Sequence, residues 1–237
     1  MTKLFLIFFF FISFLSSGEP IQRRISVVPL TGAQEESVAT RGKYAQLPSL
    51  REFIPAIKNG NSSQLVGVFI DHTLALRVVQ QPAANPGFVS STPEVVTQFS
   101  LASQYGTTGL LAHNTAAGQY FDDIHSGHKI VLVYGNGDLK YYLVDQIRQF
   151  QALSPNSPYS NFADLASSAK TLSVENLFYQ IYQSKGNLVF QTCIAKEGEP
   201  SWGRLFVIAH PIDAPSMLRI NYSSYLSVNT NQPVHLN

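Results

Sequence analysis

The distribution of apolar and polar residues from position 64 onward predicts a series of short β-strands. Segment 74–80 places three apolar side chains on one face and Arg77 on the other, the two-residue period of a half-buried strand. Only two residues separate it from the apolar segment 65–71, a gap of hairpin size. Further strand-like segments follow at 94–101, 108–112, 128–134, 139–147, 188–194 and 203–209.

These eight segments succeed one another mostly in sequence-local order. The run Gly135-Asn-Gly-Asp138 between two of them has the composition of a tight turn. Many short, locally connected strands are typical of a barrel, because closure removes exposed sheet edges. The sequence therefore predicts a mainly β fold built on an eight-stranded barrel.

Two segments interrupt the strands. Segment 115–124 follows the fourth strand and has the pattern of a short helix or turn. A long insertion, 151–186, separates the sixth strand from the seventh, and its second half, 173–183, is predicted to be helical. Ser173 has the residue type of an N-cap there, and Leu177 and Ile181 fall on one helical face.

Residues 1–18 have the pattern of a secretory signal peptide. Lys3 precedes an uncharged apolar run, and small residues follow it at 16–18. The apolar run is shorter than the ~17–25 residues that span a bilayer comfortably. An uncleaved N-terminal membrane anchor is the alternative, and either reading puts the rest of the chain outside the cytoplasm.

The pattern divides the remainder of the chain into three parts. Residues 19–63 are expected to form an extension or linker with one short helix near 50–58. The predicted β-rich domain spans 64–212, and 213–237 form a C-terminal extension.

Composition narrows the classes of function. The formal net charge is +1 and there is no polybasic run, which argues against a nucleic-acid partner. Charged residues make up 13% of the chain, against about 25% in average proteins. This composition favours a β-rich protein with an uncharged polar surface.

Cys193 is the only cysteine of the chain. Structural cysteines of exported proteins normally occur in disulfide pairs, so an unpaired one indicates a reactive thiol or an intermolecular bridge. A buried structural thiol is the alternative. A catalytic thiol needs a base or a cation nearby. His113 ends a predicted strand, Arg204 begins another, and a barrel is able to bring such strand ends together.

The order His113, Cys193, Arg204 resembles that of the sortase family. The histidine ends the apolar strand 108–113, the pair Thr192-Cys193 ends the strand 188–193, and the arginine lies near the start of the last barrel strand. The resemblance covers roughly residues 64–210, which is most of the chain after the export segment.

The resemblance implies an extracytoplasmic cysteine transpeptidase at a bacterial cell surface. Such an enzyme cleaves a sorting-motif peptide, often of the LPxTG type, and transfers it to an amine nucleophile of the cell wall or a pilin. Cys193 is then the nucleophile and His113 the general acid and base. Arg204 stabilises the acyl intermediate, and Thr192 is expected to contact the substrate. No cofactor is implied.

Other interpretations stay open at this stage. The chain could be a catalytically silent sortase-fold module that binds a peptide, or a cysteine peptidase that hydrolyses the acyl-enzyme. His125 and His128 have the spacing of a metal-binding pair, but no cluster of further ligands accompanies them, so no metal site is predicted.

Overall fold

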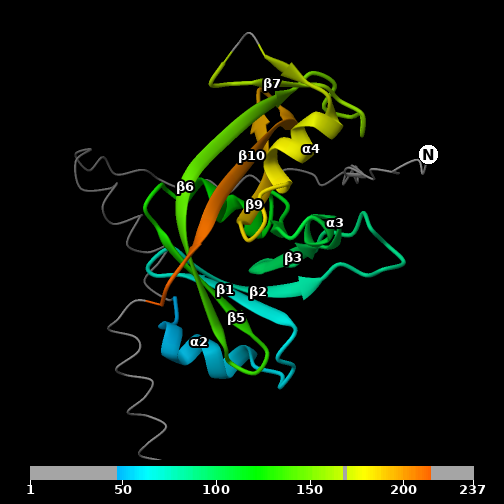
Figure 1. The fold of residues 1–237 in the computed structure, drawn as a ribbon. Coiled ribbons are helices and arrows are strands. Elements are labelled where there is room, and N and C mark those ends of the chain that lie inside the picture. The colour runs from blue at the N-terminus through cyan, green and yellow to red at the C-terminus, as the bar shows by residue number, and fades with distance from the viewer. Residues whose placement is uncertain (1–46, 168–169, 215–237) are drawn as a thin grey trace, which may run out of the picture.

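The computed structural model describes residues 47–167 and 170–214, which form a β-barrel with helices on its outer surface (Figure 1). The predicted export segment 1–18 and almost all of the predicted C-terminal extension lie outside the described residues. Their assignment, and the domain boundaries, stay predictions. Within 47–167 and 170–214, no helix has the length and apolarity needed to cross a membrane.

The described chain contains ten strands and four helical segments. The strands are β1 Leu65–Ile70, β2 Leu74–Gln80, β3 Val95–Phe99, β4 Thr108–Leu111, β5 Lys129–Tyr134, β6 Leu139–Ala152, β7 Phe162–Asp164, β8 Thr171–Leu172, β9 Leu188–Lys196 and β10 Glu199–Ile212. The helical segments are α2 Leu50–Ile57, α3 Ser100–Gln104, the 3-10 helix η1 Ala117–Asp123 and α4 Val174–Tyr182.

Eight of these strands form a closed ring. Their order is β10-β9-β4-β3-β2-β1-β5-β6, and β6 pairs with β10 to complete the barrel. Most neighbours are antiparallel, but β2 pairs with β3, and β4 with β9, in parallel. The strands β7 and β8 continue the sheet outward from β6. The predicted eight-stranded barrel is therefore confirmed.

The observed elements differ from the predicted ones mainly at their ends. The third predicted strand, 94–101, is too long at its C-terminal end, because the strand ends at Phe99 and Ser100 begins helix α3. The sixth strand extends to Ala152, since its far end pairs with both β10 and β7. The predicted short helix after the fourth strand is η1, and the predicted helix near 50–58 is α2.

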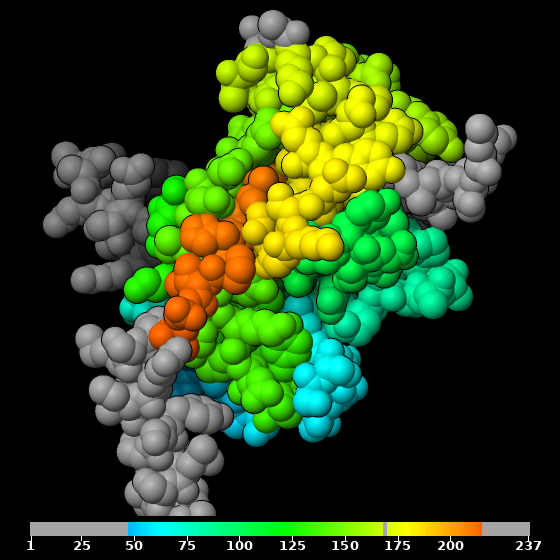
Figure 2. Space-filling model, in the orientation of Figure 1, coloured from blue at the N-terminus to red at the C-terminus, as the bar shows by residue number. Residues whose placement is uncertain are grey.

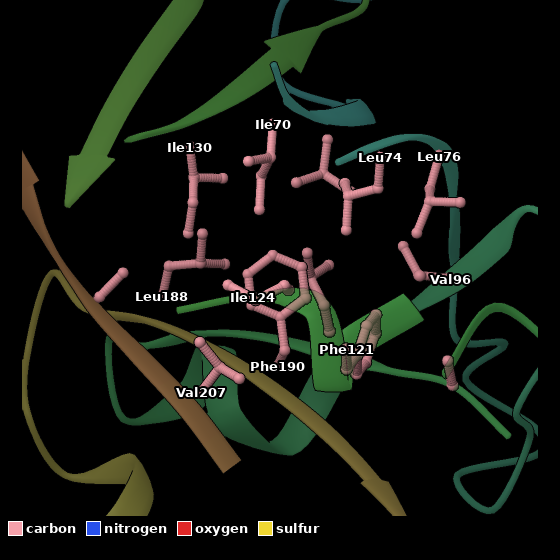
Figure 3. Packing of buried hydrophobic residues seen from close by; sticks show 14 of the residues in the cluster. Ile70, Leu74, Leu76, Val96, Phe121, Ile124, Ile130, Leu188, Phe190 and Val207 are labelled. Atoms are coloured by element: carbon pink, nitrogen blue, oxygen red, sulfur yellow. The ribbon is translucent and has the colours of Figure 1, made fainter. Parts of the chain in front are cut away.

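The inside of the barrel is filled by apolar side chains from most of its strands and from η1 (Figure 3). Phe121 of η1 meets Phe190 of β9 edge to face, with ring centroids 5.1 Å apart. Both side chains are almost fully buried. The helical segment after β4 therefore serves as a plug, so the barrel is a packed core rather than an open channel.

The insertion between β6 and β9 carries helix α4, as predicted, and covers part of the outer barrel surface. Ser173 caps α4 by accepting a hydrogen bond from the backbone N–H of Asn176 at 3.3 Å. A second apolar cluster lies beneath the helix, where Leu177 and Phe178 pack with Val189 of β9 and Phe206 of β10. In Figure 2 the insertion, yellow-green to yellow, lies at the top of the molecule beside the orange strand β10.

Helix α2 lies on another part of the barrel surface, against β1 and β5. Its side chains Phe53 and Ile57 are buried there. Gly67 permits this contact, because a Cβ atom at that position would lie 2.1 Å from Cδ1 of Ile57. A larger residue in β1 would push the helix away from the sheet.

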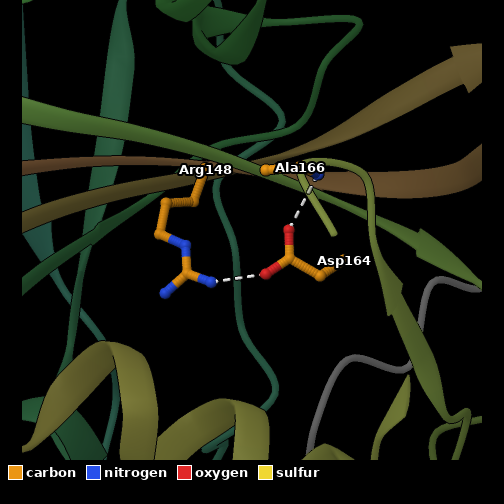
Figure 4. Close-up of polar contacts among 3 residues, drawn as sticks. All are labelled: Arg148, Asp164 and Ala166. Atoms are coloured by element: carbon orange, nitrogen blue, oxygen red, sulfur yellow. Dashed lines mark hydrogen bonds and ion pairs between the residues drawn. The ribbon is translucent and has the colours of Figure 1, made fainter. Parts of the chain in front are cut away.

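A partly buried ion pair holds the insertion against the barrel (Figure 4). Nη2 of Arg148, on β6, donates to Oδ2 of Asp164, on β7, at 2.6 Å. The other carboxylate oxygen of Asp164 accepts from the backbone N–H of Ala166 at 3.0 Å. Asp164 is 5% exposed. The carboxylate is thus paired and hydrogen-bonded, which is the condition for a buried charge to be tolerated.

We expect Asp164→Ala to lower the free energy of unfolding by about 3 kcal/mol, because it removes the carboxylate that pairs with Arg148 and leaves the Ala166 N–H without its acceptor. The matched control is Glu197→Ala, which removes an exposed carboxylate 3.6 Å from Lys196. That change should leave stability almost unaltered. Urea unfolding followed by circular dichroism measures both variants. Equal losses would show that the Asp164 pair does not hold the insertion.

Candidate active site

Cys193 lies on β9 with its side chain on the outer face of the barrel. Side chains alternate along a strand, and Phe190 of the same strand points into the barrel core while Val189 belongs to the outer cluster under α4. Cys193 has the same parity as Val189. Its thiol is free and 5% exposed. The thiol therefore sits at the edge of the surface that the insertion covers.

Arg204 lies directly across the ladder from Cys193. The two residues are register partners in the antiparallel pair of β9 and β10, so their side chains leave the sheet on the same face. Arg204 is 6% exposed. The structure thus brings together two of the three residues predicted to carry the chemistry, from segments that the sequence separates by eleven positions.

The guanidinium of Arg204 is held by backbone carbonyls rather than by a carboxylate. Its Nη1 donates to the carbonyl oxygens of Ser201, at 3.1 Å, and Gly203, at 2.8 Å. Its Cζ lies 5.8 Å from the ring centroid of Phe162 on β7. Among the ion pairs formed within the described residues, none includes Arg204. A buried cation without a carboxylate partner is suited to bind an anion that arrives or forms at the site.

His113 follows β4 by two residues and lies alongside the same end of β9. The strands β4 and β9 are parallel, with Leu111 opposite Gln191, and the N–H of Ala112 continues the ladder to the carbonyl of Gln191 at 3.2 Å. Extending this register by two residues sets His113 beside Cys193. Leu111 belongs to the outer cluster, so His113 also has the parity of the outer face.

The imidazole of His113 is half-buried and oriented by the segment between β2 and β3. Its Nε2 lies 3.2 Å from the carbonyl oxygen of Val89, which can only accept, so Nε2 carries the hydrogen. Burial lowers the pKa of His113 below the ordinary 6.5, and the Val89 contact opposes this in part. The ring is therefore neutral at pH 7, with Nδ1 as its basic atom. Acidification below pH 6.5 destabilises the folded state, because the unfolded chain binds this proton more tightly.

Burial raises the pKa of the Cys193 thiol above the ordinary value of 9.0. The positive charge of Arg204 and a hydrogen bond from the Ser201 side chain lower this pKa, and the negative charge of Glu199 raises it. The thiol is protonated at neutral pH as a result. A neutral thiol, a neutral imidazole and a fixed cation form a set in which the proton has to pass from sulfur to a base before sulfur attacks a carbonyl.

Thr192 does not join the other three side chains. Its hydroxyl points to the inner side of β9, where a Cβ on Gly118 of η1 would lie 2.2 Å from Oγ1. Within the described part of the chain this buried oxygen has no hydrogen-bond partner. Gly118 also closes the turn after His113, because its N–H donates to the His113 carbonyl at 2.9 Å. The role of Thr192 in substrate binding stays a prediction.

Two residues beside the thiol were missed at the sequence level. Ser201 and Glu199 lie in the irregular first residues of β10, before Arg204, and both affect the pKa of Cys193. Pro200 between them was the available signal, because proline inside a strand marks an edge or a bulge. No metal site emerges: the residues in 47–167 and 170–214 contain no group of three or more His, Cys, Asp or Glu side chains arranged to hold an ion.

Comparison with known proteins gives similarities of structure only. No protein-family model matches the chain, and no curated protein matches it. Sortase C1 from Streptococcus suis is 16% identical, with a TM-score of 0.45, over 81% of this chain and 92% of that one. Sortase A from Listeria monocytogenes is 13% identical, with a TM-score of 0.39, over 67% of this chain and 96% of that one.

A third similar structure is sortase C from Clostridium perfringens SM101, which is 12% identical with a TM-score of 0.38. The match covers 76% of this chain and 89% of the sortase C chain. All three are sortases, the family that the sequence resembles, and the closed eight-stranded barrel is consistent with the sortase fold. At these identities and TM-scores the similarities do not bear on the activity.

We expect Arg204→Gln to make the Cys193 thiol harder to ionise, because it removes the nearby positive charge that favours the thiolate. The midpoint of the pH profile for iodoacetamide alkylation should rise by about one pH unit. Arg204→Lys should shift it less. Alkylation is followed by intact-protein mass spectrometry, and in concentrated urea all variants should titrate alike. If the profile is unchanged in Arg204→Gln, the guanidinium has no electrostatic effect on the ionisation of the thiol.

Proposed function

We propose that this chain is a sortase-like cysteine transpeptidase. It cleaves a short sorting motif of the LPxTG type in exported proteins, holds the acyl fragment as a thioester on Cys193, and transfers it to an amine of a cell-surface acceptor. The single observation that supports this most is the register of β4, β9 and β10. It directs Cys193 and Arg204 to one face and His113 to the same edge.

In the first half-reaction the thiol proton passes to Nδ1 of His113, and the sulfur attacks the scissile carbonyl carbon. The oxyanion that forms is stabilised by the Arg204 guanidinium, whose charge no carboxylate within the described residues neutralises. The imidazolium then donates its proton to the leaving amine as the C–N bond breaks. The product is a thioester on Cys193 and a free amine.

In the second half-reaction an incoming amine attacks the thioester carbonyl while His113 takes up the proton that the amine loses. Collapse of the tetrahedral intermediate breaks the C–S bond, and the thiolate recovers the proton from His113. If water replaces the amine, the same steps give hydrolysis. The residues around the thiol are therefore compatible with either acceptor, and the distinction lies in what reaches the thioester first.

The surroundings of the thiol support an extended peptide as the substrate. The thiol lies at a sheet surface bordered by the insertion on one side and by the segment containing Val89 on the other. The apolar export segment predicted at residues 1–18 supports a location outside the cytoplasm. Bacterial cell-surface proteins that carry sorting motifs, and cell-wall or pilin amines, are the partners that this proposal implies.

The test is incubation of the protein with a panel of LPxTG-like peptides, with and without oligoglycine as the amine. We expect a covalent acyl adduct on Cys193 and, with the amine, a ligated product, both detected by mass spectrometry. Cys193→Ala should abolish the adduct. His113→Gln should lower the rate of acylation by about 10²–10⁴-fold, because it removes the proton-transfer group.

The outcomes separate the alternatives. Cleavage without ligation at high amine concentration would assign the chain to the hydrolases. Peptide binding by calorimetry without any adduct would support the silent binding module. If neither a peptide nor iodoacetamide modifies Cys193 in the folded protein, the enzyme proposal is wrong. Retained adduct formation in Cys193→Ala would move the nucleophile to another residue.

A further inference from the structure

The first residues of β10 form a bulge at 200–202. The register of β10 with β9 passes from Glu199 opposite Lys196 to Gly203 opposite Ile194, so these three residues lie opposite a single residue of β9. The pairing of β10 with β6 begins only at Gly203. The backbone carbonyls of the bulge therefore lie outside the regular ladder, where side chains are able to satisfy them.

The carbonyls at the end of the bulge hold the guanidinium of Arg204. The oxygens of Ser201 and Gly203 accept from its Nη1 at 3.1 and 2.8 Å. Ser201 and Arg204 are both buried, so the first of these bonds is formed away from bulk water. The direction of the Ser201 carbonyl thus helps to decide where the positive charge lies.

The peptide group between Pro200 and Ser201 is held at both ends by side chains. Its carbonyl oxygen accepts from Nδ2 of Asn114 at 3.0 Å, and its N–H donates to Oε1 of Glu199 at 2.9 Å. The next carbonyl along the chain is the Ser201 oxygen that binds Arg204. Because a peptide group is planar, holding this one at both ends restricts the direction that the following carbonyl takes.

Asn114 also belongs to the turn that follows His113. The carbonyl of His113 accepts from the N–H groups of Ala116 and Gly118, both at 2.9 Å, which fixes the backbone of this turn. The strand β9 lies between β4 and β10. The hydrogen bond from Asn114 to Pro200 therefore joins the two neighbours of the strand that carries the thiol.

We propose that Asn114 is a positioning residue of this site: its amide ties the turn of His113 to the bulge that holds Arg204, and so fixes the base and the cation on either side of Cys193. This inference rests on the proposed function of these three residues. Asn114 acts through the carbonyl of Pro200. Catalytic groups need such supporting contacts, because a misplacement of about 1 Å can cost about 10²-fold in rate.

The first test measures the effect of Asn114 on the cation and needs no peptide. The pH profile of Cys193 alkylation by iodoacetamide is followed by intact-protein mass spectrometry. Asn114→Ala should raise the midpoint by about half a pH unit, because a less firmly held Arg204 stabilises the thiolate less. Thr115→Ala changes the next, exposed residue of the same turn and should keep the wild-type profile.

A double variant shows whether this effect passes through the guanidinium. Asn114→Ala combined with Arg204→Gln should titrate like Arg204→Gln alone, since the group that Asn114 positions is then absent. Two other groups bear on the thiol. Glu199, on β10, disfavours the thiolate, and burial lowers the pKa of His113, which is therefore neutral where the thiol ionises. An effect through Glu199 would remain in the double variant.

The second test measures the effect on the reaction, with a peptide that acylates the wild type. Asn114→Ala should lower kcat about tenfold and leave KM within about twofold, because the reacting groups are displaced and the peptide surface is kept. Asn114→Asp keeps the shape of the side chain but offers no donor to the Pro200 carbonyl, so it should be at least as slow. Thr115→Ala is again the control.

An Asn114→Ala alkylation profile equal to that of the wild type would overturn the inference. A shift that persists in the Arg204→Gln background would also overturn it, because the effect would then bypass the guanidinium. If Asn114→Ala does not fold, Asn114→Asp against Thr115→Asp makes the comparison with the added charge matched, and equal shifts would overturn the inference. If no peptide acylates the wild type, the proposed function fails, while the alkylation profiles still decide the role of Asn114.

Discussion

The pairing of β6 with β10 is the interaction on which the remainder of the structure depends. It runs from Gly203 opposite Gln151 to Ile212 opposite Tyr141 and converts an open sheet into a closed barrel. Closure satisfies the backbone groups that an edge strand would leave unpaired. It also fixes β10 between β6 and β9, and the β9–β10 pairing then sets Arg204 opposite Cys193. The residues of the candidate site are thus positioned by the register of the barrel strands themselves.

Burial sets the electrostatic character of this site. The thiol and the imidazole are both driven toward their neutral forms, and the Arg204 cation is held by backbone carbonyls. The positive charge of Arg204 is therefore available to stabilise an anion that forms during a reaction. Such a site is quiet at rest, because little thiolate is present, and becomes reactive only when a bound group draws the proton away.

The sequence was a good guide to what depends on local pattern. The eight barrel strands, the helix capped by Ser173 and the plug after β4 follow from alternation, capping and short-range periodicity. The bulge at 200–202 was not predicted, because it depends on which residues of β9 the hairpin faces. Thr192 was assigned to the site because it precedes Cys193 in the sequence. In the structure, the alternation of side chains along β9 turns Thr192 and Cys193 to opposite faces of the strand.

The length of the insertion between β6 and β9 is less constrained than the strand register of β9 and β10. The alignment of Cys193 with Arg204 is set by a hairpin, and the link from β6 to β9 only has to return the chain to the barrel. The entropic cost of closing a flexible loop grows logarithmically, by about 0.6 kcal/mol for each doubling of its length. The insertion touches the guanidinium through Phe162 and is pinned by Asp164. The exposed loops of the insertion can therefore change in length at small entropic cost, whereas helix α4 and Asp164 are buried against the barrel and restrict the sequence there.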